Sequence, residues 1–263
     1  MTNPLIDIGA NLTHDSFEDD RDQVIERAAD VGVTRIVVTG TNAESSHDAL
    51  ALARTRPGKL YATAGMHPHH ASDYTAAVSA ILSELVQEDA VVAVGECGLD
   101  YCRNFSTPQD QRNAFESQLE IAVQSGLPVF LHQRDAHEDF VRLLKPVIGE
   151  ISAGVAHCFT GDRDALDECL SMGLYIGITG WICDERRGQT LGDIIADIPL
   201  DRLMIETDAP YLLPRTLDPK PKTRRNEPAY LTEVLRVVAE SVQESETTVA
   251  QATTANAERF FGL

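Results

Sequence analysis

Residues that bind metal ions or move protons recur at the ends of five apolar runs in this chain. The runs read LYATAGMHPHH, VVAVGECGLD, LPVFLHQRD, SAGVAHCFTG and LMIETDAP. Their polar ends contain six side chains of interest, namely His67, His69, Glu96, His132, His157 and Asp208. Mixed imidazole and carboxylate ligands suit hard and borderline divalent cations. The pattern therefore predicts a metal site on which several strand ends converge.

The elements that would position these residues alternate along the chain as eight strand-then-helix units. The strands are apolar throughout, as in a parallel sheet buried on both faces. The helical stretches repeat apolar residues at i, i+3 and i+4, as in Phe115, Leu119 and Val123. Eight such units in 263 residues predict a (β/α)8 TIM barrel.

The alternative fold is a doubly wound sheet, which usually places its site at one switch point. Here the candidates follow the third, fourth, fifth, sixth and eighth strands instead. We expect a single domain over residues 1–263, in which a last helix at 247–262 packs on the barrel as a tail.

Composition limits the classes of partner. The net charge of -19 argues against non-specific binding to duplex nucleic acid or to anionic membranes. No run is long enough to span a membrane, and the N-terminal stretch lacks the features of a signal peptide. The five cysteines form no CxxC pair, so a reducing cytoplasm is the expected compartment. We further expect a monomer.

Glu96 and two histidines are the strongest metal ligands. A buried carboxylate needs a partner, and Glu96 can bridge two cations or form an ion pair with Arg103 or Lys145. His132 and His157 end consecutive strands, which lie about 4.8 Å apart when paired, so both imidazoles can reach one ion. Alternatively, both are core histidines bonded to backbone carbonyls.

Asp208 follows the eighth strand, where it can ligate a metal and take a proton from water. Its alternative is a turn residue before Ala-Pro. Glu206 shares its parity and points the same way if the strand continues. His67 and His69 can ligate a metal or hold a phosphate oxygen, or simply shape a turn.

Two further residues are candidates for substrate contact. Arg225 lies in a proline-rich loop beside Asn226 and Glu227, and its guanidinium suits phosphate unless the group is only a solvated charge cluster. Trp181 can stack on a base, or pack as a core residue.

Seven motifs together resemble the TatD family of metal-dependent deoxyribonucleases. They are TAGMHPH, VGECGLDY, PVFLHQRDAH, HCFTG, GITGWICDERRG, IETDAPYLLPR and RRNEP. The resemblance implies a TIM barrel with two divalent cations, Mg²⁺ in the first place and Mn²⁺ or Zn²⁺ as alternatives. It implies hydrolysis of phosphodiester bonds, with 3′-5′ exonuclease action on single-stranded DNA and RNA in one subgroup.

The same resemblance assigns the ligands. Glu96 would bridge the cations, His132 and His157 would hold one, and Asp208 would hold the other. One departure concerns the first strand, where many family members carry a His-x-His pair. This chain has Gly9 and Asn11 there, so we expect looser binding of the first cation.

These residues support a metal-dependent nuclease in which Asp208 and Glu96 are catalytic, and His67, His69 and Arg225 bind phosphate. A rival is a metallohydrolase of a small amide, lactone or phosphoester. A third possibility is a catalytically silent binding protein, which would require the strand-end ligands to be lost.

Overall fold

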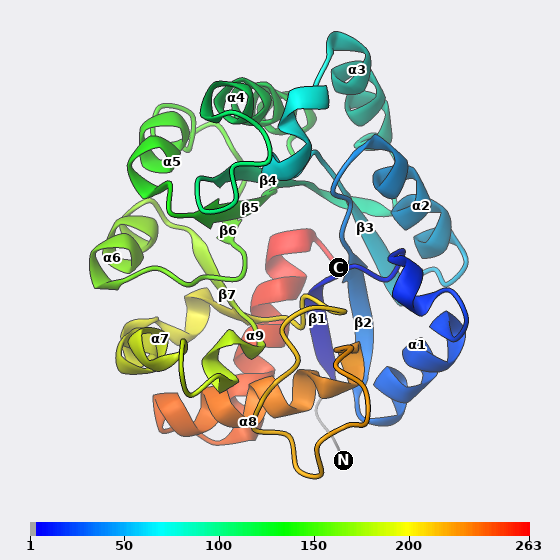
Figure 1. Cartoon of the computed structure of the whole chain (residues 1–263), viewed down its shortest axis with the longest axis vertical. Coiled ribbons are helices and arrows are strands. Elements are labelled where there is room, and N and C mark those ends of the chain that lie inside the picture. Colours follow the sequence, from blue (N-terminus) through cyan, green and yellow to red (C-terminus); the bar gives the residue numbers. More distant parts are fainter. Residues whose placement is uncertain (1–3) are drawn as a thin grey trace.

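Eight parallel strands arranged in sequence order form the framework of the computed structural model, which describes residues 4–263 (Figure 1). The strands are β1 (Leu5–Ala10), β2 (Val33–Val38), β3 (Leu60–Ala64), β4 (Val91–Asp100), β5 (Val129–Arg134), β6 (Gly154–Ala156), β7 (Tyr175–Ile178) and β8 (Leu203–Ile205). The predicted (β/α)8 TIM barrel is confirmed. A doubly wound sheet is wrong, because each strand pairs with the next one in the chain.

Helices follow the strands and form the outer layer (Figure 1). The α-helices are α1 (Arg21–Asp30), α2 (Ala43–Arg54), α3 (Ala76–Leu85), α4 (Pro108–Ser125), α5 (His137–Leu144), α6 (Arg163–Ser171), α7 (Gln189–Ile194), α8 (Leu231–Val242) and α9 (Glu246–Phe261). Short 3-10 helices are η1 (Asp15–Phe17), η2 (Pro68–Asp73), η3 (Gly180–Cys183), η4 (Ile195–Asp197), η5 (Leu200–Arg202) and η6 (Pro228–Tyr230).

The local sequence explains where the longest helix, α4, begins and ends. The Thr107 side chain accepts a hydrogen bond from the backbone N–H of Asp110, and Pro108 occupies the first turn, where its missing N–H is not needed. Gly126 ends the helix with a φ of +73°, a conformation that glycine adopts without strain. This helix lies against β4, the strand that carries Glu96.

The barrel is closed by backbone hydrogen bonds that join the C-terminal end of β1 to the residues that follow β8. The N–H of Asp208 donates to the carbonyl of Gly9 at 2.8 Å, and the N–H of Asn11 donates to the carbonyl of Ala209 at 2.7 Å. Residues from the first and the eighth unit therefore face each other at the C-terminal mouth, where barrel enzymes carry their sites.

The interior of the barrel is filled by apolar side chains and sealed at its N-terminal end by α9. A cluster inside the ring combines strand residues such as Ile8, Phe130 and Met204 with Phe260 and Phe261 of α9. In Figure 1, α9 lies in the middle of the ring of helices. The last helix thus does more than the tail that we predicted, because its aromatic residues complete the core.

Several element boundaries differ from those that the sequence predicts. The stretches HEDFVRLLKPVIG (137–149) and PAYLTEVLRVVAESV (228–242) each predict one helix. Helix α5 ends at Leu144 instead, because Pro146 cannot continue a helix. Helix α8 is preceded by the separate turn η6. Strands β6 and β8 end before His157 and Glu206, so these side chains lie in the turns that follow the strands.

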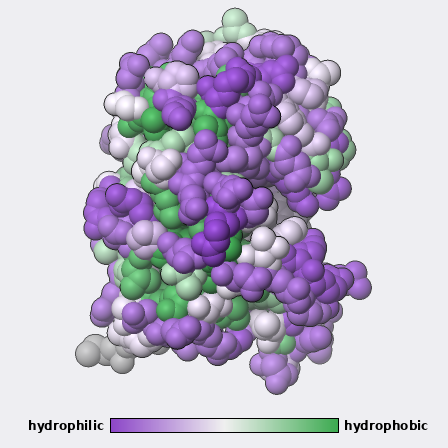
Figure 2. Space-filling model, turned by 90° about the vertical axis from the view of Figure 1, so that its left-hand side faces the viewer, coloured by the Kyte–Doolittle hydropathy of each residue, from purple (hydrophilic) through white to green (hydrophobic). Residues whose placement is uncertain are grey.

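The outer surface follows from the amphipathic helices. Figure 2 shows the side on which α5, α6 and α7 lie, where hydrophilic side chains cover most of the surface and apolar ones gather in patches between them. Between residues 4 and 263, no helix combines the length and the apolar character that crossing a membrane would require.

Candidate metal centre and catalytic cavity

A cavity of about 750 Å³ opens at the C-terminal mouth of the barrel. It brings together six of the seven site residues predicted from the sequence, which are His67, His69, Glu96, His132, His157 and Asp208. They come from five different strand-and-helix units, either from the strand itself or from the segment after it, so their proximity is a product of the barrel and not of sequence neighbourhood.

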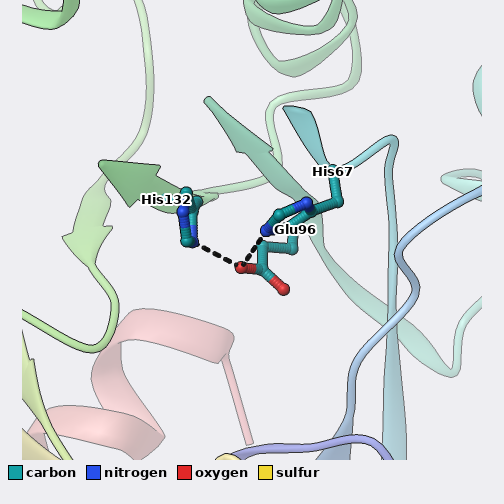
Figure 3. A group of neighbouring side chains, drawn as sticks. All are labelled: His67, Glu96 and His132. Carbon is teal, nitrogen blue, oxygen red and sulfur yellow. Dashed lines mark hydrogen bonds and ion pairs between the residues drawn. The ribbon is translucent and has the colours of Figure 1, made fainter. Parts of the chain in front are cut away.

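The centre of the cavity is one carboxylate oxygen surrounded by imidazole nitrogens (Figure 3). Glu96 Oε1 lies 2.9 Å from His132 Nδ1. The same oxygen lies 3.2 Å from His157 Nε2 and 3.4 Å from His67 Nε2. Glu96 itself is buried in the middle of β4. The ion pair of Glu96 with Arg103 or Lys145, the alternative raised by the sequence, does not occur among residues 4–263.

This donor set fits a divalent cation. Ligand atoms of His67, Glu96 and His132 all lie within 4.8 Å of one another. The Nε2 atom of His132 is buried and finds no hydrogen-bond partner among the described residues. Asp100 Oδ2, 3.6 Å away, is too distant for an ordinary hydrogen bond. Since buried polar atoms are rarely left unpaired, this nitrogen is suited to a ligand.

The charges within the cluster depend on burial and on close neighbours. Burial opposes charge on Glu96, but the imidazoles, chiefly His67 and His157, outweigh it and hold the pKa of Glu96 well below 4.5. Burial also opposes charge on His157, but Glu206 and then Glu96 raise its pKa well above 6.5. Burial lowers the pKa of His67 well below 6.5. Burial also opposes charge on His132, but the carboxylates of Asp100 and Glu96 raise its pKa above 6.5. In the metal-free protein, His157 and His132 therefore hold a proton more tightly than His67 does.

Glu206 supports the His157 ring from behind. Its Oε2 lies 2.8 Å from His157 Nδ1, and its Oε1 accepts a hydrogen bond of 2.6 Å from the N–H of Cys158. A Cβ at Gly9 would lie 2.6 Å from Oε2, and one at Gly177 would lie 2.6 Å from Oε1. The fully buried carboxylate therefore has room only because both positions are glycine.

Asp208 lies across the cavity, partly exposed to it. The side-chain amide of Asn11 donates to Asp208 Oδ1 at 3.1 Å. Burial, together with the nearby charges of Glu96 and Glu206, raises the pKa of Asp208 to about 7, although His157 acts in the opposite direction. A carboxyl with such a pKa is suited to exchange protons near neutral pH.

Asp100 is a site residue that the sequence reasoning missed. Its Oδ2 lies 2.8 Å from His69 Nε2, and its Oδ1 accepts a hydrogen bond from the N–H of Arg103. Glu96 and Asp100 are the only ionisable carboxylates in the run VVAVGECGLD, and β4 continues as far as Asp100. The length of this strand-like run was the signal in the sequence that a second carboxylate, Asp100, belonged to the same strand as Glu96.

Arg225 is the one predicted site residue that the structure does not bring to the cavity. Its guanidinium makes two hydrogen bonds of 2.7 Å to the carboxylate of Asp20, and it lies over the ring of Phe17 at 4.8 Å. The adjacent Asn226 is buried, where it donates to the carbonyl of Thr207. The geometry therefore gives no support to a phosphate contact by Arg225.

Other basic and aromatic groups do line the cavity. Trp181 is among them, with Arg187 above its ring at 4.3 Å and Arg134 at 5.5 Å. Phe105 and Tyr211 also line the cavity, and they are 68% and 51% exposed. Exposed aromatic rings beside guanidinium groups are surfaces on which unpaired bases can stack.

The barrel and this cluster define the class of (β/α)8 metal-dependent hydrolases. Within that class, the chain belongs to the TatD-related DNase family, because the family model "TatD related DNase" matches residues 6–262.

Named relatives are similar over their full length. A protein from Pectobacterium parmentieri named "3′-5′ ssDNA/RNA exonuclease TatD" is 53% identical over 259 residues, which cover 98% of this chain and 100% of that protein. Among solved structures, the TatD homologue YjjV from Escherichia coli superposes with a TM-score of 0.91 at 30% identity, with both chains covered completely. A TatD-family hydrolase from Entamoeba histolytica reaches 0.88 at 27% identity, with 99% of each chain covered.

Proposed function

We propose that this protein is a divalent-metal-dependent exonuclease that removes nucleotides from the 3′ ends of single-stranded DNA and RNA. The observation that carries the proposal is a single Glu96 oxygen that meets three imidazole nitrogens at the C-terminal mouth of the barrel. The exonuclease name of relatives that are about half identical to this chain supports this substrate and this polarity.

The ligands of two cations come from residues already close together. Glu96, His132, His157 and Asp208 would hold the cations. His67 joins them, since its Nε2 belongs to the tight group around Glu96. Oxygen and nitrogen ligands of this kind admit Mg²⁺, Mn²⁺ or Zn²⁺. We take Mg²⁺ as the working metal, because it commonly shares its shell with waters and substrate phosphates.

The first strand contributes little to either cation. Glycine at position 9 has no donor, and the space beside it is filled by the carboxylate of Glu206. Asn11 is already bonded to Asp208. Water and substrate phosphate oxygens would therefore complete the coordination of a cation held by Asp208. The affinity of the protein for that cation should then depend on whether substrate is bound.

The remaining steps belong to the chain's own side chains. When bound, the cations supply positive charge to the phosphate oxygens and lower the pKa of water. Asp208 accepts a proton from the attacking water. The water oxygen forms the new bond to phosphorus, the P–O3′ bond breaks, and the departing oxygen takes up a proton from solvent. His69, held by Asp100, orients a phosphate oxygen. Arg225 has no part in this proposal.

We further propose that the protein works as a monomer in the cytoplasm. All six residues that surround the cavity centre come from one chain, so a partner subunit is not required to complete the site. The five cysteines are free, which is suited to a reducing compartment. Light scattering at the concentration of the activity assay tests the monomer.

The test compares two 5′-labelled single strands with Mg²⁺ or Mn²⁺ and with a chelator. One strand has a free 3′ hydroxyl and the other a blocked 3′ end. We expect metal-dependent shortening from the 3′ end of the free strand only. Equal degradation of the blocked strand would contradict the 3′-5′ polarity. No degradation of either strand, with turnover of p-nitrophenyl esters, would favour the rival small-molecule metallohydrolase.

A further inference from the structure

A second cavity of about 540 Å³ adjoins the catalytic one. It is lined by residues of the turn after β7, at 180–187, and of the long loop of residues 211–224. Arg187 and Leu212 line both cavities, so the two spaces are neighbours with common walls. A chain molecule bound at the metal centre can therefore continue into the second cavity.

This second cavity is basic, although the whole protein is strongly acidic. Five of the chain's 22 basic residues line it, namely Arg186, Arg187, Arg215, Lys220 and Arg224. Two acidic residues form ion pairs with three of them: Asp184, which also lines the cavity, and its neighbour Glu185. The carboxylate of Asp184 is bonded by Arg186 and Arg187 at 2.9 Å, and Glu185 is bonded by Arg215 at 2.7 Å. Three positive charges therefore remain in excess, in a chain whose net charge is -19.

Two of the cations are available to a ligand. Lys220 and Arg224 are exposed, and neither forms an ion pair with another of residues 4–263. The other three guanidinium groups are held in place by carboxylates. The arrangement combines fixed charges at the cavity wall with two long side chains that can close on an anion.

The walls of this cavity are closely packed. A Cβ at Gly180 would lie 2.2 Å from the carbonyl oxygen of Leu212, so the turn and the loop approach more closely than a larger residue would permit. A Cβ at Gly188 would lie 2.5 Å from the carbonyl oxygen of Trp181. Buried Asp184 holds Arg186 and Arg187, which follow it in the same turn.

Trp181 lies beside Arg187, which lines both cavities. Its ring lines the catalytic cavity, and the guanidinium of Arg187, which lines both, lies 4.3 Å above it. A base stacked near Trp181 would direct the next phosphates of a strand toward the cations of the second cavity. Alternating stacking and phosphate contacts are the usual means of holding single strands.

We propose that the second cavity binds the phosphodiester backbone of the strand being degraded, beyond the nucleotide at the metal centre. The inference rests on the proposed function and adds a second binding site to it. It accounts for how a protein of net charge -19 retains a polyanion: the attraction is confined to one basic cavity beside the reaction centre.

The test uses the double variant Lys220→Ala/Arg224→Ala, with Lys59→Ala/Lys145→Ala as the control. Both pairs are exposed and remove two positive charges, but Lys59 and Lys145 lie before β3 and after α5, toward the other end of the barrel. Values of kcat/KM are measured for a dinucleotide and for a strand of about 12 nucleotides, at salt concentrations from roughly 50 to roughly 300 mM.

For the long strand, log(kcat/KM) falls as log[salt] rises. Loss of two phosphate contacts should make this fall less steep, by about 1.4 in the slope. At roughly 0.1 M salt, kcat/KM of the double variant should therefore be about 25-fold lower than that of the wild type. The dinucleotide should be cleaved as fast as by the wild type, and the control should match the wild type on both substrates.

Three results would overturn the inference. In the first, the double variant cleaves the long strand as fast as the control does. In the second, kcat/KM of the double variant falls as much for the dinucleotide as for the long strand, which would place Lys220 and Arg224 at the reaction centre. In the third, inorganic phosphate competes with the dinucleotide in the wild type but not in the double variant, which would indicate a site for free phosphate. Failure of the wild type to cleave any single strand would instead contradict the proposed function.

Discussion

Glu96 is the side chain on which the proposed metal centre would depend most, because no other carboxylate oxygen in the cavity lies within 3.4 Å of three imidazole nitrogens among residues 4–263. Such a group acts through its charge rather than through its volume. Glutamine has nearly the same shape and hydrogen-bonding reach, but it is neutral. Replacement of Glu96 by glutamine therefore separates its chemical contribution from its contribution to packing.

We expect Glu96→Gln to lower kcat/KM by at least about 100-fold, since loss of a metal ligand exceeds the effect of a group that only supports one. The melting temperature should change by no more than about 4 °C, which corresponds to roughly 1 kcal/mol in a chain of this size. Calorimetric titration should show weaker metal binding. Glu150→Gln, at an exposed position, is the control. Metal affinity equal to that of the wild type would exclude Glu96 as a ligand.

Asp7 provides a pH-dependent contribution to stability. It is fully buried, and burial raises its pKa from 3.8 to about 7 despite hydrogen bonds from Thr207 and Gly9. The folded protein therefore holds this proton more tightly than the unfolded chain does. The stabilisation is complete below about pH 4 and is lost as the pH rises through 7.

The isosteric variant Asp7→Asn lacks this titration. The free energy of unfolding of the wild type minus that of Asp7→Asn should fall by up to about 4 kcal/mol between pH 4 and pH 8. Urea unfolding at a series of pH values measures the difference. A difference that grows with pH would mean that Asp7 is buried as an ionised, hydrogen-bonded carboxylate.

At the scale of the elements, the two ends of the barrel have separate tasks. The C-terminal parts of the strands and the turns after them carry the proposed ligands, whereas α9 closes the opposite end with Phe260 and Phe261. The ring of Phe260 packs edge-on against Tyr175 at 5.5 Å between centroids. Stability and chemistry can therefore be changed independently.

We expect Phe260→Ala to lower the free energy of unfolding by about 3–5 kcal/mol, as for other large-to-small changes in a core. Activity per folded molecule should stay within about twofold of the wild type, because the metal centre lies at the other end. Phe105→Ala is the contrast: at 68% exposure, it should change stability by less than about 0.5 kcal/mol. A loss of metal affinity in Phe260→Ala would show that the two ends are coupled.

For the whole molecule, charge decides which nucleic acids can bind. A net charge of -19 repels a duplex that needs a broad basic face, whereas one basic cavity is enough for a flexible strand. The substrate should therefore be a single strand or a frayed end.

This expectation is measurable with single strands, blunt duplex and covalently closed duplex at equal nucleotide concentration, low salt and Mg²⁺. Single strands should be degraded fastest, and closed duplex at least about 100-fold more slowly, because it offers neither an end nor unpaired bases to stack. Internal cleavage of closed duplex at the rate of single strands would require a basic groove other than the cavity described above.

The fold class and most of the candidate site residues of this protein could be predicted from its sequence alone. The alternation of apolar and amphipathic stretches identified the barrel, and side chains of the types that bind metals, placed in or just after the strands, identified six residues that line one cavity. Both signals are local, because burial imposes its period on each element and the C-terminal ends of parallel strands share one mouth.

The tertiary structure decided which atoms meet. Arg225 pairs with Asp20, which lies 205 residues away in sequence, and it is thereby withdrawn from the cavity. Glu206 supports His157 only because two distant glycines leave it room. Contacts of this kind depend on how loops and strand registers come together across the barrel, and no local pattern of residues encodes that geometry.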